Sequence, residues 1–227
     1  MYVSDVRVVF GPDELARVGE FRYRIYVEEQ GKSAAFADHE KRRLIEPADR
    51  RASTTIFWIE RDGAILGTVR AEILHAKHED AQMLNVDRFD FLRPTEIIYF
   101  SRLMISRCAR GSDITAKLCR LGFLLGLSKD CRLGVLTCNP QLVPMFEKFG
   151  YLNYARPFIH AESGPQVPMA ILGEVDYLRT VGAPLAEWPA LHRPENQLTT
   201  QFLAWIEAFS QRAEAPHSAR TGCRLTA

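Results

Sequence analysis

Two arginines beside a predicted helix start are the first residues in this sequence whose types and spacing could do chemistry. Arg107 and Arg110 belong to a short loop that reaches Gly111 and Ser112, and an apolar helical pattern follows over residues 113–129. The start of a helix presents unpaired backbone N–H groups and the positive end of the helix dipole, which together bind phosphate. Because guanidinium groups would repel that dipole in the absence of an anion, we expect these arginines to grip a phosphate.

The charge around this loop is unlike that of the whole chain. The segment from Arg102 to Arg132 carries seven basic and two acidic residues, a net charge of +5, whereas all 227 residues together carry +1. The near-neutral total argues against nucleic-acid binding as the main task. A basic segment suits an acidic or phosphate-bearing partner, although a lysine such as Lys117 could equally be an ordinary solvated residue.

The residues before the loop form a predicted strand. Residues 97–105 are rich in β-branched and aromatic types, and the pair Ser101-Arg102 lies within them. Strand, loop and helix therefore make one unit, and we expect a cleft beside the strand with the arginines of the loop facing it.

Earlier segments supply charges that need partners. A predicted helix begins at Gly11-Pro12 and runs toward Gly31, and Arg22 lies on it among apolar neighbours, so an acidic partner is expected. The aperiodic loop of residues 32–52 is long enough to be functional or mobile. A hairpin with an Asp62-Gly63 turn follows over residues 53–74, and its charged residues two positions apart are expected to pair with each other.

The remaining elements complete an α/β (α+β) fold. The sequence predicts a strand over residues 133–138, a helix from Asn139-Pro140 to Phe149-Gly150, and strands over 151–159 and 167–178. We therefore expect a mixed, mostly antiparallel sheet of about seven strands flanked by helices. Residues 1–180 would form this domain. Residues 181–227 would form a linker over 184–194, an amphipathic C-terminal helix and a tail that is disordered from about residue 211. We expect the apolar face of that helix to dock on the domain, with a second subunit as the alternative.

Composition indicates in which compartment the protein works and whether it binds a membrane or a metal. The sequence shows no signal segment and no apolar run long enough to cross a bilayer, so no stable membrane insertion is expected. Its five cysteines lack the close pairs of a zinc site and fit a reducing cytoplasm. His75 and His78 have no companion cluster of ligands, and we predict no metal site.

Five short motifs occur in an order that is typical of one protein family. They are Phe21-Arg22-Tyr23-Arg24-Ile25-Tyr26-Val27-Glu28-Glu29, Glu46-x-x-Asp49, Gly67-Thr68-Val69-Arg70, Ser101-Arg102 and Arg110-Gly111-Ser112. With the helix that begins at Asn139-Pro140, they make the chain resemble the GNAT superfamily of N-acyltransferases. Within it, the chain is similar to the branch of N-acyl amino acid synthases and N-acylhomoserine lactone synthases.

The resemblance implies an acyltransferase. Such an enzyme moves an acyl group, typically long-chain, from a thioester to the amine of an amino acid or related small molecule. The donor is acyl-phosphopantetheine on an acyl carrier protein or, less commonly, acyl-coenzyme A, and no tightly bound cofactor is expected. Because carrier proteins are acidic, the +5 segment is the surface that we expect to meet one.

Aminolysis of a thioester needs a neutral amine, a hydrogen-bond donor for the developing oxyanion and a channel for the acyl chain. We expect backbone N–H groups near Leu103 to Ile105 to polarise the thioester carbonyl, and Arg70 and Arg102 to hold the acceptor's carboxylate. The predicted donor-binding residues are Leu103, Met104, Ile105, Arg107, Arg110, Gly111, Ser112 and Lys117.

Glu46 and Asp49 would pair with Arg22 or Arg70 and build the acceptor pocket. The general base stays open between Glu72, Glu96 and a water held by Tyr99. A purely structural ion network is the alternative role for Arg22, Arg70, Arg102, Glu46 and Asp49.

The chain departs from the family pattern in three places. Arg110 stands where a coenzyme A loop usually has glycine, Tyr99 stands where the branch commonly has glutamate, and residues 31–52 lack the tryptophan of lactone synthases. The first departure weakens a coenzyme A donor, the second suggests a non-catalytic acyl-carrier or lipid-binding protein on the same fold, and the third ranks an N-acylhomoserine lactone synthase lower. These two proteins and a coenzyme A-dependent acetyltransferase are the alternatives.

Overall fold

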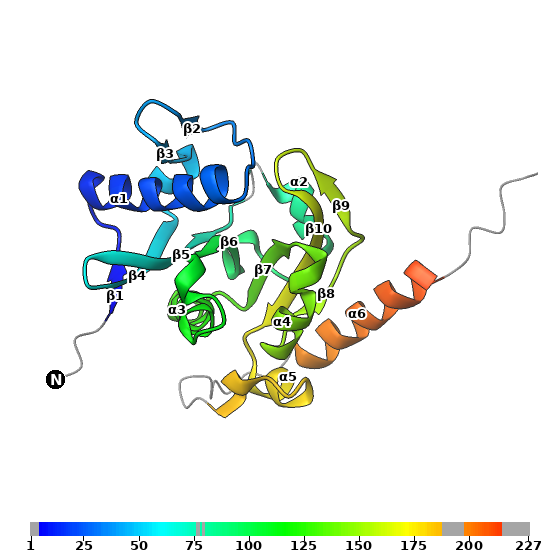
Figure 1. Ribbon diagram of the computed structural model, residues 1–227. Helices are drawn as coiled ribbons and strands as arrows, with labels where there is room; N and C mark the ends of the chain where they lie inside the picture. The colour runs from blue at the N-terminus through cyan, green and yellow to red at the C-terminus, as the bar shows by residue number, and fades with distance from the viewer. Residues whose placement is uncertain (1–4, 76–77, 79, 188–197, 215–227) are drawn as a thin grey trace, which may run out of the picture.

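A mixed sheet forms the centre of the protein. The computed structural model describes residues 5–75, 78, 80–187 and 198–214 (Figure 1). Within this part of the chain the sheet has eight strands, in the order β1-β4-β5-β6-β7-β10-β8, with β9 beside β10. The strands are β1 (Val6–Val8), β4 (Thr54–Arg61), β5 (Ala64–Ile73), β6 (Ile97–Ile105), β7 (Leu133–Cys138), β8 (Leu152–Asn153), β9 (Phe158–His160) and β10 (Gly164–Leu172). β6 and β7 run parallel and the other pairs antiparallel, which confirms the predicted sheet.

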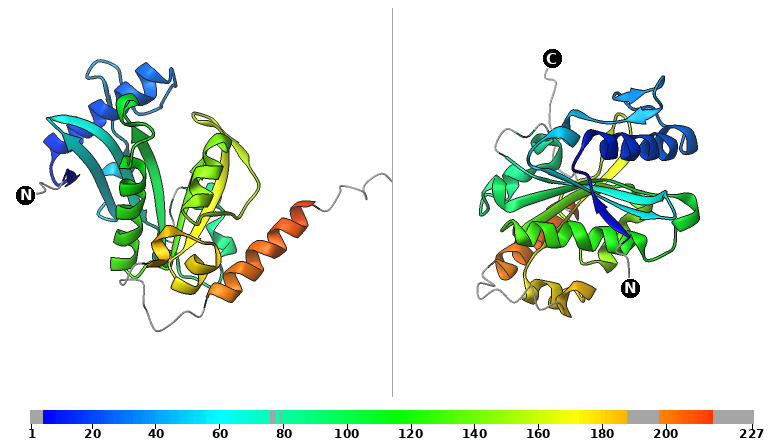
Figure 2. Two further views of the ribbon diagram at one scale, coloured as in Figure 1. Left: turned by 60° about the horizontal axis from the view of Figure 1, so that its bottom comes forward. Right: turned by 90° about the vertical axis from the view of Figure 1, so that its left-hand side faces the viewer.

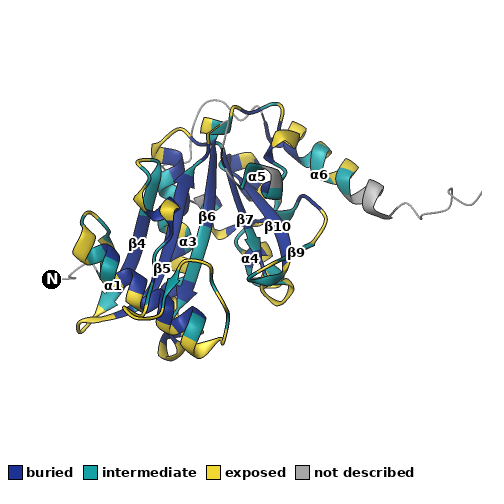
Figure 3. Cartoon of the chain, turned by 90° about the horizontal axis from the view of Figure 1, so that it is seen from above, coloured by how far each residue is buried: buried dark blue, intermediate teal, exposed yellow. Residues whose placement is uncertain are grey.

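Helices cover both faces of this sheet. They are α1 (Pro12–Tyr23), α2 (Ala81–Leu84), α3 (Ile114–Ser128), α4 (Val143–Lys148), α5 (Val175–Thr180) and α6 (Thr199–Glu214). A π-helical turn, Arg24–Glu29, continues α1, and a small second sheet pairs β2 (Ala37–Asp38) with β3 (Arg43–Leu44). Seen from the side, α1 lies over one face of the sheet and α3 over the other (Figure 2). The strands between them are buried over most of their length (Figure 3).

Local turn chemistry follows the sequence closely. Gly11 caps α1 with Pro12 as its first residue, as predicted. Asp62 and Gly63 adopt φ angles of 51° and 77°, the conformation that a two-residue hairpin turn requires. Gly150, at φ 96°, ends α4 where the sequence places the stop.

The two halves of the sheet separate beside β6. The parallel ladder between β6 and β7 runs from Ile97 and Leu133 to Phe100 and Leu136 and ends there. β6 continues beside β5 as far as Ile105, while β7 continues beside β10 as far as Cys138. Beyond Phe100 the two strands therefore stay with different neighbours, and a gap opens between them.

Phe100 sits at the point of separation because two glycines make room for its ring. A Cβ on Gly122 of α3 would lie 2.8 Å from the ring, and one on Gly134 of β7 would lie 2.7 Å from it. Any side chain at either position would push the ring out of its place. These close approaches fix the inner end of the gap.

The C-terminal part corrects three predictions. Residues 175–180 form α5 instead of extending a strand, residues 154–157 interrupt the strand expected over 151–159, and α6 extends through residues 211–214, which were expected to be disordered. The linker expected over 184–194 begins with the helical turn Pro184–Glu187, and its other residues, like 215–227, lie outside the described part. The division of the chain at residue 180 stays a prediction. Among the described helices, no stretch combines the length and hydropathy that a membrane span requires.

The predicted docking of the C-terminal helix on the domain is confirmed. Phe202 of α6 is fully buried, with ring centroids 5.2 Å from Tyr177 and 6.5 Å from Phe89. Glu174 caps the start of α6, because its carboxylate accepts hydrogen bonds from the backbone N–H groups of Leu198 and Thr199.

Candidate active site

A cavity of about 420 Å³ occupies the gap between β6 and β7. Residues Ser101 to Met104 of β6 form one wall, and Leu136 to Asn139 at the end of β7 form the other. Tyr26 reaches the cavity from the α1 side, whereas Cys119 of α3 and Phe146 of α4 reach it from the opposite face. The cavity is therefore lined from both faces of the sheet, which suits two substrates that enter from different sides.

Arg102 owes its position to an irregularity in β6. Thr68 of β5 pairs with Met104 and Arg70 pairs with Ser101, so two residues of β6, Arg102 and Leu103, lie opposite Val69 alone. Arg102 adopts a left-handed φ of 53°, which a residue with a Cβ rarely takes without strong contacts. This bulge interrupts the regular ladder with β5 at Arg102 and Leu103, two residues that line the cavity.

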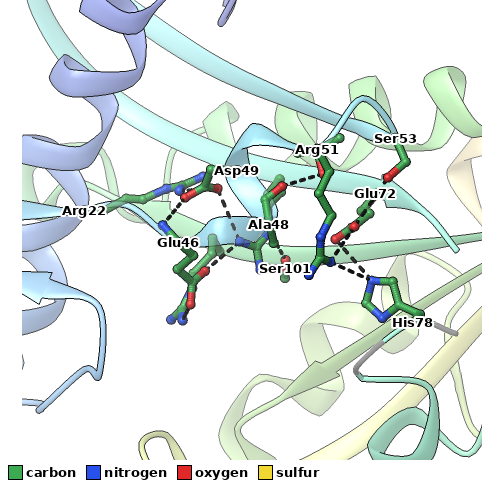
Figure 4. A network of polar contacts seen from close by, with 12 residues as sticks. Arg22, Glu46, Ala48, Asp49, Arg51, Ser53, Glu72, His78 and Ser101 are labelled. Atoms are coloured by element: carbon green, nitrogen blue, oxygen red, sulfur yellow. Dashed lines mark hydrogen bonds and ion pairs between the residues drawn. The ribbon is translucent and has the colours of Figure 1, made fainter.

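A buried ion network lies beside the cavity (Figure 4) and contributes Glu46, Arg70 and Arg102 to its lining. Arg22 Nη1 donates to Asp49 Oδ1 at 2.8 Å, and Arg70 Nη1 donates to Glu46 Oε2 at 2.6 Å and to Asp49 Oδ1 at 3.2 Å. Arg102 donates to Glu46 through both Nε, at 2.8 Å, and Nη2. The predicted pairing of Glu46 and Asp49 with Arg22 and Arg70 is confirmed, and Arg102 joins it.

The loop before β4 delivers both acids of this network. Its helical turn, Pro47–Arg50, lets Asp49 Oδ2 accept a hydrogen bond from the backbone N–H of Glu46 at 2.7 Å. Burial favours the protonated form of Glu46, but Arg102, then Arg70 and Arg22, lower the pKa of its carboxyl to about 2. Burial likewise opposes the charge of Asp49, yet Arg22 and Arg70 hold its pKa below the usual value.

A second buried cluster lies beside the first. Arg51 Nη1 donates to Glu72 Oε1 at 2.8 Å, and His78 Nε2 lies 3.3 Å from Glu72 Oε2. Glu72 does not pair with Arg70, its neighbour two residues away on β5, because Arg70 turns to Glu46 and Asp49. The expectation that charges two positions apart would pair is therefore wrong here.

The structure brings part of the predicted set to the cavity. Its lining includes Glu46, Arg70, Tyr99, Arg102, Leu103 and Met104. Arg22, Asp49 and Glu72 are buried in the two ion clusters, and Ile105 ends β6 outside the lining. Glu96 lies before the start of β6 and pairs with Arg93, so it stands at the end of the strand away from the cavity.

The basic residues of the loop lie outside the cavity lining. Arg110 pairs with Glu29 at the surface, and Lys117 pairs with Asp113 at 2.7 Å. Arg107 and Ser112 are exposed, and Gly111 adopts a φ of 79° where the chain turns toward α3. The expectation that the two arginines face the cleft is corrected by this placement, because Arg110 is held by a carboxylate and neither guanidinium lines the cavity. Their contact with a donor stays a prediction.

Sequence reasoning missed several residues that line the cavity. These are Tyr26, Lys32, Asp80, His160 and Glu162. Glu162 lies in the tip of the β9–β10 hairpin, accepts a hydrogen bond from the backbone N–H of Ala35 at 2.7 Å and approaches Arg102 at 4.0 Å. Asp80 lies in a segment without periodicity. Neither Asp80 nor Glu162 carries a local sequence signal, because each reaches the cavity through tertiary contacts alone.

The comparisons with known proteins agree with this geometry. The family described as N-acyl amino acid synthase FeeM matches residues 17–172, more than half of the chain. The chain belongs to the FeeM family of N-acyl amino acid synthases. It is an acyltransferase, and the matched residues contain both walls of the cavity and both ion clusters.

Solved structures share the fold of this FeeM-family chain. FeeM itself, an N-acyl amino acid synthase from uncultured soil microbes, is 14% identical with a TM-score of 0.63, over 80% of this chain and 96% of that one. TofI, in a ternary complex with an inhibitor and MTA, is 16% identical with a TM-score of 0.61, over 82% and 98%. BjaI, a CoA-dependent acyl-homoserine lactone synthase, is 14% identical with a TM-score of 0.61, over 82% and 96%. A comparison with curated protein sequences finds no significant match.

Proposed function

We propose that this enzyme transfers a long-chain acyl group from the phosphopantetheine thioester of an acyl carrier protein to the α-amine of an amino acid. The observation that carries the proposal is the cavity between β6 and β7, which joins a charged side to an apolar side. Membership of the synthase family supplies the reaction class. The choice of acceptor and donor rests on the lining of the cavity and on the surface charge.

The charged side suits a zwitterionic acceptor. The side chain of Arg102 is 17% exposed against 5% for Arg70, so Arg102 is the guanidinium that an acceptor carboxylate can reach. Arg70 would act by holding Glu46 in place. Lys32, whose Nζ lies 5.1 Å from the Tyr26 ring centroid, adds a second cation to this wall. Glu162 places a carboxylate on the facing wall, where an ammonium group would be favoured.

The apolar side suits the acyl chain. Leu103 and Met104 face Leu136, Cys138 and Phe146 across the gap. The bulged backbone at Arg102 and Leu103 would present an N–H group to the thioester carbonyl as the oxyanion develops. A volume of about 420 Å³ lies in the range typical of small-molecule sites and leaves room for a chain longer than acetyl.

The surface charge favours a carrier protein over free coenzyme A. Arg107, Arg110 and Lys117 lie outside the cavity, on the surface around the start of α3, where a docked macromolecule could reach them. Exposed charges of this kind raise the rate of association with an acidic partner. Carrier proteins and free thiols both fit the cytoplasm, where we place the reaction.

The experiment compares the two donors directly. Purified enzyme is given decanoyl thioesters of an acyl carrier protein and of coenzyme A, and kcat/KM is measured with each. The double variant Arg107→Glu, Arg110→Glu should lower kcat/KM for the carrier-bound donor about tenfold or more while sparing coenzyme A. Lys148→Glu, an exposed position at the end of α4 and outside the +5 segment, is the control. Equal losses with both donors, or no loss, would count against the carrier protein.

A further inference from the structure

We propose that Asp80 and Tyr99 form the proton-transfer pair of this enzyme, with Asp80 as general base and Tyr99 as general acid, and that Glu72 and His78 position them. The inference rests on the acyl transfer proposed above. It assigns a role that the family pattern leaves open here, because tyrosine stands at residue 99.

Tyr99 and Asp80 reach the cavity from separate elements. Tyr99 lies on β6, one residue before the point where β6 and β7 separate, and it is 6% exposed. Asp80 is half-buried and lies directly before α2, and it lines the same cavity. Tyr99 therefore stands at the inner end of the gap, where a thioester between the two strands would be attacked, and Asp80 lines the cavity that this gap holds.

His78 links the two residues. Its Nδ1 accepts a hydrogen bond from the backbone N–H of Asp80 at 3.1 Å, and its ring meets the Tyr99 ring edge-on with centroids 6.2 Å apart. On the other side of the ring, Nε2 lies 3.3 Å from Glu72 Oε2 and 3.4 Å from Arg51 Nη1. The His78 side chain is fully buried, so both the ring and the backbone of Asp80 are held in one arrangement.

The charges around Tyr99 keep its phenol protonated. Burial, and then the negative charge of Asp80, raise the pKa of Tyr99 well above its usual value, while Arg70 and Arg102 oppose this rise and Glu46 adds to it. A phenol that holds its proton so tightly is a poor base, and it can give the proton to a leaving thiolate only if another proton replaces it at once. Protonated Asp80 can supply that proton, so Tyr99 acts as an acid by relaying a proton from Asp80 to the sulfur.

The other carboxylates are less suited to remove a proton. Glu46 has a pKa of about 2 and is bound by two arginines, so it is a weak base. Glu72 is buried behind Tyr99 and is engaged by Arg51 and His78, and it does not line the cavity. Glu96 lies at the other end of β6.

The proposed proton transfers balance. The amine nitrogen attacks the thioester carbonyl, the C–N bond forms, and one N–H proton passes to the Asp80 carboxylate. The C–S bond then breaks, the sulfur leaves with the bonding electron pair, and it takes the proton of the Tyr99 hydroxyl. In the same step protonated Asp80 passes its proton to the Tyr99 oxygen, so no free phenolate forms. The products are an amide and a free thiol, and both side chains regain their starting states.

The test measures kcat and KM of variants with decanoyl thioesters and L-amino acids, after a check that each variant melts like the unaltered protein. Asp80→Asn should lower kcat about 100-fold or more with little change in KM, and Tyr99→Phe should also lower kcat. The double variant should be no slower than the slower single variant, because the two residues act as one unit.

A rescue experiment and two further variants complete the test. Formate should restore part of the activity of Asp80→Ala. His78→Gln should lower kcat less, and Asp87→Asn, an exposed residue of the next helical turn, should be unchanged.

The outcomes separate the inference from the proposed function. If the unaltered protein acylates no amine with either donor, both are overturned. If it is active and Asp80→Asn keeps its kcat, or formate has no effect on Asp80→Ala, the inference alone is overturned. A loss confined to KM would also overturn it, because that result would give Asp80 a role in binding only.

Discussion

Arg102 holds Glu46 through two nitrogen atoms, Nε and Nη2, each of which donates to a different carboxylate oxygen. The two residues are 56 positions apart in sequence, and their pairing ties the loop before β4 to the bulge of β6. It also aims the exposed edge of the guanidinium at the cavity. Three of the four predictions below concern this ion network, and the fourth concerns the docking of α6.

Arg102→Lys should lower kcat/KM about tenfold or more. A lysine ammonium keeps the charge but cannot reproduce the two parallel hydrogen bonds that orient the guanidinium. Steady-state kinetics with a saturating donor would show the loss as a higher KM for the acceptor. Arg43→Lys is the matched control, because Arg43 binds Glu20 through the same two nitrogens on the exposed surface. Activity as high as that of the unaltered enzyme would remove Arg102 from the acceptor site.

Acid should destabilise the protein as Glu46 takes up a proton. The folded-state pKa of Glu46, about 2, lies below its usual value of 4.5, so the stability that its charge contributes is fully present above pH 4.5. That contribution, on the order of 3 kcal/mol, should be lost as the pH falls toward 2. The free energy of unfolding, measured with urea across this pH range, should depend less steeply on pH in Glu46→Gln than in the unaltered protein. Identical pH profiles for the two proteins would contradict the cause assigned to the low pKa.

Asp49→Asn should destabilise the fold by roughly 3–5 kcal/mol. The change removes the negative charge that the fully buried Arg22 and the buried Arg70 share. Arg70 keeps Glu46 as a partner, whereas the Arg22 guanidinium loses the carboxylate that it binds. Thermal unfolding should show a melting temperature about 10 °C lower or more. Asp38→Asn, which breaks a partly exposed pair with Lys41, should change stability by less than about 0.5 kcal/mol. A small effect at Asp49 would show that the pair is dispensable.

Glu174→Gln should loosen α6 without unfolding the sheet. Glu174 is buried, binds Arg132, and caps α6 through the N–H groups of Leu198 and Thr199. A neutral amide loses the favourable interaction with the helix dipole and with the arginine. Hydrogen exchange should rise in α6 and stay unchanged in β6. Asp176→Asn, exposed in α5, is the control, and protection of α6 equal to that of the unaltered protein would refute the capping role.

Much of the fold could be predicted from the sequence because it depends on local chemistry. Gly11-Pro12, Asp62-Gly63 and Phe149-Gly150 set helix ends and a hairpin turn through backbone preferences that act within a few residues. The strand over 167–178 was overextended because residues 175–180 are apolar enough to be buried either way, and only their packing as α5 decides the outcome.

The site was harder to predict because its charged residues pair with partners that are far away in the sequence. The motifs placed Arg22, Glu46, Asp49, Arg70 and Arg102 together, yet nothing local indicated that Glu72 would turn to His78. Asp80 and Glu162 enter the cavity through the course of a loop and the tip of a hairpin, which no periodicity encodes. Arg107 and Arg110 were expected at the cleft because their loop follows β6, but the chain turns away at Gly111 before α3 begins.

The measurement that tests the central claim most directly is product analysis by mass spectrometry. The purified enzyme is incubated with a decanoyl thioester and a mixture of ¹⁵N-labelled amino acids. The account predicts a product in which the decanoyl group is bound to a labelled α-nitrogen, and a matched loss of this product in Arg102→Lys. Recovery of intact thioester with unmodified amino acids, or acylation of the protein alone, would contradict it.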